Sequence, residues 1–552
     1  MTPNEVFAAE ADVIVVGSGG AAFAAALNAS WEGADVLMLE KGSRVGGTTF
    51  KSHGWTWWPN NSYLRSAGLT DERTDALRYM AKLARPHRYQ PDAPTLGLDR
   101  WEYDWLATFY DEAGGVLDNL VERGALRVMH GAEVPDYFAN LPEDKAPRGR
   151  VMMMSTEDGE LGYGDELVAQ LVRAGEEAGI PLHTEHEVVQ LLVNDARAVT
   201  GVTARTSEGL RSFRARQAVV FGTGGFGRNE EYLSNFLAHP TFGSCAAVTN
   251  TGDFIPLATS LGAQLRNMNN AWFAPTTFEK WINCQDDPDY ASLFAPPGDS
   301  MVFVNRYGRR VMNEHAVYNE LAQGFFGWDG ARSEFPNLFQ LMIWDDDCQR
   351  IFNGYPNRND NPIPPAGEDD SHVIKGATWP ELVANIRERF GSLAEQTGGY
   401  ELDDHFEETL AATVERFNKL ARQGRDDDFG RGDNPIEIVL QMHNTPALRE
   451  SDLPSKQLHP ISDTGPFYAT IATAGTLDTK GGPLTNTDSQ VLDAMGLPIP
   501  GLYGAGNCVA SGSGKGYFAA GATLAPALTF GAIAGRRAAA EPVKELQTVL
   551  SA

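Results

Sequence analysis

The chain has 552 residues, which is enough for two or more domains built around a large core. Its formal charge of −28, from 45 basic and 73 acidic residues, argues against nucleic acid or an anionic membrane surface as a partner. The four cysteines are widely spaced and form no CxxC pair for zinc or redox chemistry, so a reducing cytoplasm is the expected setting.

The N-terminal residues MTPNEVFAAEADVIVVG lack the basic region and the separate apolar segment of a signal peptide. No run in the chain reaches the roughly 18–20 apolar residues that are needed to cross a bilayer. We therefore expect a cytoplasmic protein without an integral membrane segment.

A first nucleotide-binding unit begins with the β-branched apolar run Ala11 to Val16, which predicts a strand buried on both faces. A GxGxxA turn, an alanine-rich helix over 23–31 and a second strand over 35–39 follow. In this βαβ pattern the glycines permit a tight turn and close approach of a pyrophosphate, and the acid that ends the second strand binds ribose hydroxyls. An acid there disfavours a 2′-phosphate, which predicts FAD or NAD rather than NADP. The expected cofactor-binding residues are Gly17, Gly19, Gly20, Ala21, Ala22, Glu40 and Lys41.

A second turn, Gly46-Gly47-Thr48-Thr49, follows the acid closely. It resembles the turn that wraps the pyrophosphate and ribityl chain in flavoproteins of the fumarate reductase and ketosteroid dehydrogenase superfamily. Relatives with a histidyl-flavin bond carry their histidine where this chain has Thr48. The resemblance therefore implies a non-covalent FAD, with His53 as a packing residue or a polar lining.

Residues 66–130 predict helices, with aromatic side chains at helical spacing. A Pro-rich segment follows and contains Asp136-Tyr137-Phe138; by default such a segment is a surface connector. In ketosteroid dehydrogenases a proline-aspartate-tyrosine loop carries an active-site tyrosine. The resemblance makes Tyr137 the candidate, and a structural role is the alternative.

A third glycine turn closes the first part of the nucleotide-binding domain. After a helix over 164–178 and strand segments over 182–184, 187–192 and 198–213, the buried run ARQAVVF ends in Gly222-Thr223-Gly224-Gly225. This turn resembles the second flavin-binding turn of the superfamily, and Val188 falls where relatives hold the adenine through backbone groups. We expect the FAD-binding domain to cover 1–262, with a helical insertion at about 66–160, and to resume at 456–552.

Residues 263–455 predict an inserted cap domain, because nucleotide-type glycine turns disappear and aromatic residues cluster there. Within it, MVFVNRYGRRVMNEHAVYN predicts a strand, a turn, a second strand and a loop that includes Tyr318; Asn313 and Glu314 match a hairpin motif of the superfamily. The stretch 337–400 is rich in Pro, Asn and Asp, and we expect an elaborated surface loop or an oligomer contact there.

The stretch from Gly501 to Gly531 predicts a short strand, a glycine turn and a helix from about Thr523. Its bare backbone and helix N-terminus suit an electron-rich ring or a developing oxyanion. One large polar side chain, Tyr517, stands four residues before Gly521. The residues expected to hold the ring end of a flavin are Gly506, Asn507, Thr523 and Leu524.

Four C-terminal segments carry the strongest family resemblance: 465–469, 479–482, 500–503 and 521–524. Together they closely resemble 3-ketosteroid Δ1-dehydrogenases, in matching order over nearly the whole chain. The resemblance implies an α/β fold, with a Rossmann-like FAD-binding domain of the glutathione reductase/fumarate reductase type and an inserted α+β cap. It implies that Tyr517 and Gly521 bind a ketone oxygen, that Tyr318 is the base, and that Tyr137 hydrogen-bonds to the base.

The expected activity is FAD-dependent 1,2-desaturation of a cyclic ketone, either a 3-oxosteroid or a smaller cyclohexanone-type ring. The electron acceptor is expected to be external, because no haem or iron–sulfur motif is present, and no metal site is expected. A fumarate- or enoate-type reductase is the alternative, but 516–521 contains no arginine and 476–482 no histidine to hold a carboxylate. A flavin-binding redox protein without turnover is the third reading, which the assembled tyrosines disfavour.

Overall fold

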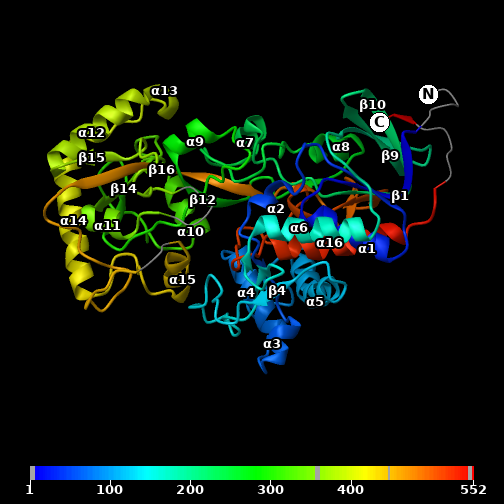
Figure 1. Ribbon diagram of the computed structural model, residues 1–552, viewed down its shortest axis with the longest axis horizontal. Helices are drawn as coiled ribbons and strands as arrows, with labels where there is room; N and C mark the ends of the chain where they lie inside the picture. Colours follow the sequence, from blue (N-terminus) through cyan, green and yellow to red (C-terminus); the bar gives the residue numbers. More distant parts are fainter. Residues whose placement is uncertain (1–6, 355–360, 445–447, 545–549, 552) are drawn as a thin grey trace. The chain divides into compact units, whose positions relative to one another are not determined.

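The computed structural model describes residues 7–354, 361–444, 448–544 and 550–551 (Figure 1). The chain forms two units, the first made of Met1–Ala238, Ala246–Trp272 and Asp478–Ala552, the second of His239–Cys245 and Phe273–Leu477. The second unit thus ends at Leu477, whereas the sequence suggested 455, because strand β16 (Phe467–Thr479) pairs with β14 (Gln340–Asp345) inside it. No helix in the described ranges is long and apolar enough to cross a membrane.

A nine-stranded sheet, counted over the described residues, is the centre of the first unit, with the order β20-β8-β9-β10-β1-β2-β7. Strand β19 pairs with the second half of β10, beyond the part that pairs with β9, and pairs in turn with β18. The expected buried runs form the parallel strands β1, β2, the second half of β10, and β19. The strands are β1 Ala9–Val16, β2 Val36–Leu39, β7 Leu182–His183, β8 Glu187–Val193, β9 Val199–Thr206, β10 Gly209–Phe221, β18 Gln490–Leu492, β19 Pro498–Gly504 and β20 Leu550–Ser551.

Helices α1 (Gly20–Trp31) and α16 (Leu524–Ala539) lie side by side, and α6 (Gly164–Glu177) lies next to α1 (Figure 1). Small residues let α1 and α16 pack closely. A Cβ atom at Gly531 would lie 2.4 Å from the carbonyl oxygen of Ala21, and one at Gly535 would lie 2.1 Å from that of Ala25. The alanine-rich helix and the small-residue helix therefore pack backbone against backbone, which fixes the C-terminal segment beside the first glycine turn.

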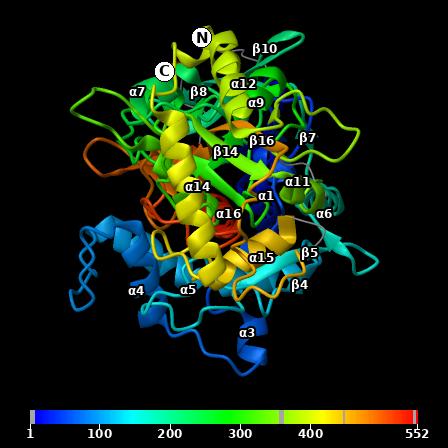
Figure 2. The same ribbon diagram turned by 90° about the vertical axis from the view of Figure 1, so that its left-hand side faces the viewer.

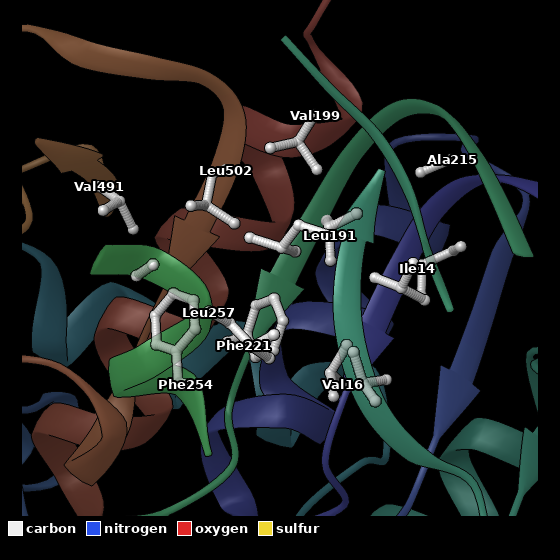
Figure 3. Close-up of a cluster of buried hydrophobic side chains, with 14 of the residues drawn as sticks. Ile14, Val16, Leu191, Val199, Ala215, Phe221, Phe254, Leu257, Val491 and Leu502 are labelled. Atoms are coloured by element: carbon white, nitrogen blue, oxygen red, sulfur yellow. The ribbon is translucent and has the colours of Figure 1, made fainter. Parts of the chain in front are cut away.

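Apolar side chains from all three segments of the first unit form one buried cluster on the sheet (Figure 3). Ile14 and Val16 of β1 belong to the same cluster as Leu502 of β19. Phe254 of α8 (Phe254–Ser260) stacks on Phe221 of β10, with ring centroids 4.1 Å apart. This core holds the strand ends in register.

The segment at about 66–160 is only partly helical, which differs from the expected helical insertion. Helices α3 (Ser62–Ser66), α4 (Arg73–Ala84) and α5 (Arg100–Glu122) lie between one short strand before them and three strands after them. Among the described residues these strands form a four-stranded sheet, β3-β5-β4 with β6 on β5. They are β3 Thr56–Trp57, β4 Val128–His130, β5 Val151–Ser155 and β6 Leu161–Gly162.

The described part of the second unit contains a five-stranded sheet of order β12-β16-β14-β13, with β15 also paired to β16. Helices α12 (Trp379–Ser392) and α14 (Phe406–Gln423) pack with it in one apolar core (Figure 2). The further elements are β12 Ala271–Thr277, β13 Met301–Val304, β15 Ile374–Gly376, α9 Phe278–Cys284, α10 Tyr318–Gln323, α11 Asp346–Ile351, α13 Ala394–Thr397 and α15 Pro435–Asn444.

Two expectations for this unit are wrong. The stretch 337–400 is no simple surface loop, since it supplies β14, which is fully buried, and α12; residues 355–360 lie outside the described ranges. The second strand expected after the turn at Gly308 does not form in the described chain. Instead the Arg310 side chain pairs with Glu314 at 2.7 Å and with Asp426 at 2.8 Å, and these buried ion pairs replace strand pairing.

The short elements that remain complete the described secondary structure. They are α2 Gly47–Lys51, α7 Glu230–Phe236, β11 Leu265–Arg266, β17 Gly482–Pro483 and the 3₁₀ turns Gly324–Phe326 and Gly506–Cys508. Two of them, α2 and the turn at 506–508, contain glycines that the sequence predicted to contact a cofactor.

Candidate cofactor and substrate site

Four predicted segments meet at one edge of the main sheet. Val16 is paired with Leu39 and with Phe221, and Phe221 is paired with Gly504, so the carboxyl ends of four parallel strands coincide. Backbone hydrogen bonds continue past these ends, from Gly17 N to Leu39 O at 2.8 Å and from Gly222 N to Val16 O at 2.8 Å. Open α/β sheets bind ligands in the crevice outside such strand ends.

The first turn is shaped by close backbone approach. Gly17 has φ +103°, and a Cβ atom there would lie 2.6 Å from the carbonyl oxygen of Gly222, so a side chain is excluded. Gly19 is the N-cap of α1 and has no side chain with which to cap the helix. The atom nearest to a Cβ built on Gly19 lies 3.5 Å away. With Ala21 and Ala22 in its first turn, α1 begins at a glycine N-cap that supplies no capping side chain, which fits a pyrophosphate.

The Glu40 carboxylate lies buried directly after β2. It accepts from the Ser18 hydroxyl at 2.5 Å and from the Gly42 N–H at 2.7 Å. Burial raises its pKa above the ordinary range, although both hydrogen bonds oppose that shift. A carboxylate offers about four acceptor positions, so acceptor capacity remains for a ribose hydroxyl beside the bonds from Ser18 and Gly42.

Lys41 and Val188 lie beside this acid. The Lys41 ammonium donates to Asp253 at 2.9 Å and lies 3.7 Å from Glu187, so the protein itself already neutralises its charge. Val188 is buried near the start of β8, and His186 N–H donates to the Glu40 carbonyl at 2.8 Å. The backbone at Val188 is thereby held next to the predicted ribose site.

The turn at 46–49 is hydrogen-bonded to the glycine turn that begins at Gly17. Gly20 N–H donates to the Thr49 hydroxyl at 3.0 Å, and Gly46 N–H donates to the Ser18 hydroxyl at 2.9 Å. Gly46 and Gly47 have φ of +102° and +50°, and nothing lies within 4 Å of a Cβ built on Gly47. Open space therefore remains beside the backbone, as a bound cofactor requires.

Asp478 joins three of the predicted turns, although the sequence analysis did not single it out. Its Oδ2 accepts from Gly225 N at 3.1 Å, from Asn507 Nδ2 at 2.9 Å and from Asn250 Nδ2 at 3.1 Å. The Asn250 amide also donates to the Thr48 hydroxyl at 3.1 Å. The turn Gly222–Gly225, the C-terminal turn and α2 are thus tied to one buried carboxylate.

A small hollow lies where the C-terminal turn meets the start of α16. Thr523 precedes α16 as its N-cap without a side-chain cap, and Leu524 is the first helical residue. Apolar rings and bare backbone line the hollow together, which suits a flat aromatic ring system. Its lining includes Gly506, Asn507 and Thr523, with Trp105, Trp272 and Phe530.

Tyr517 and Gly521 lie in the segment that leads to α16. The buried Tyr517 ring meets Tyr137 edge to face, with centroids 5.2 Å apart, and lies 6.5 Å from the ring of Trp272. Gly521 has φ +87°, and a Cβ atom there would lie 2.4 Å from the Trp55 carbonyl oxygen. Among the described residues no acceptor is found for the Gly521 N–H, so this group is available to donate to a ligand.

A buried lysine, which the sequence analysis missed, supports this segment. Lys480 is fully buried, and its Nζ donates to the carbonyl oxygens of Gly514 at 3.0 Å and Gly516 at 2.8 Å. The same ammonium lies 4.7 Å from the ring centroid of Trp272, within the range of a cation–π contact. The cation therefore fixes the backbone immediately before Tyr517.

Tyr318 belongs to the second unit, where it is the first residue of α10. The motif before it is anchored in that unit, because the Asn313 amide donates to Glu437 at 2.8 Å. Burial raises the pKa of Glu437 to about 7. The structure thus brings Tyr137, Tyr517 and Gly521 together in the first unit and places Tyr318 in the second.

Comparison with known proteins gives a consistent picture. The family described as "FAD binding domain" matches residues 12–524. A 4-oxocyclohexanecarboxylate 2-dehydrogenase of Sinomonas cyclohexanicum is 31% identical, over 98% of this chain and 94% of the relative. A 3-oxosteroid 1-dehydrogenase of Mycolicibacterium smegmatis is 29% identical, over 95% of this chain and 96% of the relative. The structure of 3-ketosteroid Δ1-dehydrogenase from Sterolibacterium denitrificans, in complex with 1,4-androstadiene-3,17-dione, has a TM-score of 0.79 at 28% identity and covers 96% of this chain and 99% of that chain.

Proposed function

The chain belongs to the FAD binding domain family, and on that premise we propose that it catalyses the FAD-dependent α,β-dehydrogenation of a cyclic ketone. The observation that carries the proposal is the buried Tyr517, with Tyr137 against it and the available Gly521 N–H in the same segment. The N-terminus of α1 would hold the pyrophosphate, Glu40 the ribose, and the hollow at Asn507 and Thr523 the flavin ring. A bound flavin supplies a hydride acceptor.

Polarisation of the ketone is the first task of the side chains. The proton next to a carbonyl is only weakly acidic until the oxygen is stabilised as negative charge develops on it. In the proposal, the Tyr517 hydroxyl and the Gly521 N–H donate to this oxygen, as the donors of an oxyanion hole do. Because both groups sit in a buried segment whose backbone is bound by Lys480, little reorganisation is needed when the charge forms.

Removal of the proton requires a base, and we assign this role to Tyr318. An ordinary tyrosine has a pKa of about 10, so its pKa must be lowered, or its proton relayed, for the step to run near neutrality. Tyr137 is proposed to assist the base through its hydroxyl while its ring packs on Tyr517. Both assignments rest on the family resemblance.

The dicarboxylate alternative gains no support from the described site. The segment 476–482 carries Lys480 as its cation, and this residue is fully buried with its Nζ on two backbone carbonyls. A fumarate-type substrate would need cations directed at its carboxylates, because an unpaired buried charge is very costly. A neutral ketone needs only hydrogen-bond donors.

The test is an anaerobic titration of the yellow holoprotein with a 3-oxosteroid and, separately, with a cyclohexanone-type ketone. The names of the relatives include both substrate types, so either ring is a candidate. Bleaching of the flavin absorbance by one ketone, with colour restored by an artificial external acceptor, is the expected result. Absence of bleaching by both would leave a flavin-binding protein without this turnover.

A further inference from the structure

A buried ionic cluster lies under the loop that carries Tyr137. Arg150 is only 1% exposed and is surrounded by the carboxylates of Asp71, Asp136 and Asp144. Its Nη2 and Nε donate to Asp71 at 2.7 and 2.8 Å, and its Nη1 donates to Asp136 at 2.5 Å and to Asp144 at 3.1 Å. We call these four residues the Arg150 cluster.

The cluster holds more acids than bases, so its charge is unbalanced if every carboxyl ionises. Burying an uncompensated charge is costly, and a carboxyl group responds by keeping its proton. Burial raises the pKa of Asp136 to about 7, against the opposing effects of Arg150 and the Trp57 N–H, and the pKa of Asp144 is raised for the same reason. Tyr79 and Tyr110, two titratable neighbours of the cluster, have their pKa values raised by burial and stay neutral.

The geometry is that of an ionised Asp136. Its Oδ1 accepts from Trp57 Nε1 at 2.8 Å while its Oδ2 accepts from Arg150. Protonation of Asp136 removes the negative charge that strengthens both of these bonds, above all the charge-assisted bond from Arg150. The hold on its side chain is therefore weaker in the protonated form.

The loop following Asp136 is docked on the segment that contains Tyr517. Tyr137 N–H donates to the carbonyl oxygen of Phe518 at 3.1 Å, and the Tyr79 hydroxyl donates to the same oxygen at 2.6 Å. Phe138 N–H in turn donates to the Tyr79 hydroxyl at 3.3 Å. The loop is thus docked on Phe518 by the two residues that directly follow Asp136, whose own side chain is bound by Arg150 and Trp57.

We propose that Asp136 is a positioning residue, whose ionised side chain, clamped between Arg150 and Trp57, holds the Tyr137 loop in the arrangement that the reaction needs. The inference rests on the proposed function, because it presumes that the Tyr137–Tyr517 pair serves catalysis. Asp71 binds the Nε and Nη2 of the same guanidinium, and Asp144 shares Nη1 with Asp136, so both acids help to keep Arg150 in place. Loss of the clamp loosens the pair without removing any group that touches the substrate.

The kinetic test is the pH profile of kcat, measured on the holoenzyme with a ketone that bleaches the flavin. In the native enzyme kcat should rise as pH passes through about 7, and we call this rise the limb of the profile. The value on the acid side should be roughly tenfold lower, because small misplacements of catalytic groups are costly. Asp136→Asn cannot ionise and turns a donor toward Arg150, so it should show the low value throughout and no limb. Asp111→Asn, in a half-exposed pair with Arg73, is the matched control and should keep the limb.

A second variant shifts the limb rather than abolishing it. Trp57→Phe removes the N–H that favours the Asp136 carboxylate, so the pKa of Asp136 should rise and the limb should move to higher pH. A role of Asp136 in folding alone would lower activity without moving any midpoint. An unmoved limb in Trp57→Phe, or a normal limb in Asp136→Asn, overturns the inference.

Amide hydrogen exchange separates this inference from the proposed function. The protection factor of the Tyr137 amide, which donates to Phe518, should fall as pH drops through about 7 in the native protein but not in Asp136→Asn. If that change appears while no ketone bleaches the flavin, the clamp stands and the proposed function fails. If ketones bleach the flavin but protection is independent of pH in both proteins, the clamp is refuted and the function stands.

Discussion

The rings of Tyr137 and Tyr517 meet edge to face, with centroids 5.2 Å apart and planes at 75°, although the two residues lie far apart in the sequence. The contact joins the loop between β4 and β5 to the glycine-rich segment before α16. Tyr137 N–H reinforces it through its hydrogen bond to Phe518. A tyrosine pair fixed in this way is more rigid than either loop alone, which is what preorganised hydrogen bonding to a substrate oxygen requires.

Tyr517→Phe tests the carbonyl-anchor role directly. Loss of the hydroxyl should leave the bound yellow flavin intact but reduce the rate of ketone-dependent bleaching by at least roughly tenfold, because one oxyanion donor is lost. Stopped-flow absorbance measures the rate. Tyr503→Phe is a suitable control, since its hydroxyl donates to Glu541 at 2.8 Å in the same part of the chain. Unchanged bleaching in Tyr517→Phe would rule out the role.

Tyr318→Phe tests the base. If the Tyr318 oxygen removes the proton next to the carbonyl, the variant should lose exchange of that proton with solvent deuterium while still binding ketone and FAD. NMR of the recovered ketone measures the exchange. Tyr307→Phe, at a tyrosine whose hydroxyl bonds to Glu334, should exchange normally. Normal exchange in Tyr318→Phe would move the base role to another group.

Asp478→Asn should weaken FAD binding. An asparagine replaces the shared acceptor by a group with fewer lone pairs and two N–H donors that face Asn250 and Asn507, so buried donors lose their partner. Each unsatisfied buried group costs about 1–3 kcal/mol, which corresponds to roughly five- to hundredfold in Kd. Flavin fluorescence on dilution measures the affinity. Asp488→Asn, in a half-exposed pair with Arg537, should bind FAD as the native protein does.

The thermal stability should depend on the proton of Asp136. Its folded pKa of about 7 lies above the ordinary 3.8, so between these values the folded state binds more protons than the unfolded state. The stability contributed by this group is complete below about pH 4 and is lost as pH rises through about 7. The Tm of Asp136→Asn should therefore fall less over this window than that of the native protein. Parallel curves would show that Asp136 does not titrate there.

The glycine turns could be predicted because their physical requirement is local. A backbone that must adopt positive φ or approach a ligand needs glycine at fixed offsets from a strand and a helix, and Gly17, Gly46 and Gly506 meet that need with φ of +103°, +102° and +76°. The same argument located Glu40 at the end of β2. These features required no knowledge of distant contacts.

The connecting residues could not be predicted, because their role exists only through residues far away in sequence. Asp478 looks like an ordinary strand-end acid until Gly225, Asn250 and Asn507 converge on it. The stretch 337–400 was misjudged for a related reason. Its Pro- and Asn-rich flanks dominated the composition, whereas the short run of β14 pairs with both β13 and β16.

Lys480→Met tests how the Tyr517 segment is held and also separates two substrate classes. Methionine fills a similar volume but removes the donor from the Gly514 and Gly516 carbonyls and the cation from the Trp272 ring. Two buried carbonyls then lose a partner, which costs about 1–3 kcal/mol each, so the segment should loosen.

The expected result for Lys480→Met is a lower kcat for every ketone, with FAD still bound, measured by steady-state kinetics on a neutral ketone and on one that carries a ring carboxylate. Lys515→Met, at the exposed neighbouring lysine, should behave as the native enzyme does. If the buried ammonium instead paired with a substrate carboxylate, the variant would lose affinity for the charged ketone alone and turn over the neutral one normally. That outcome would contradict the positioning role of Lys480 and reopen the carboxylate-binding alternative.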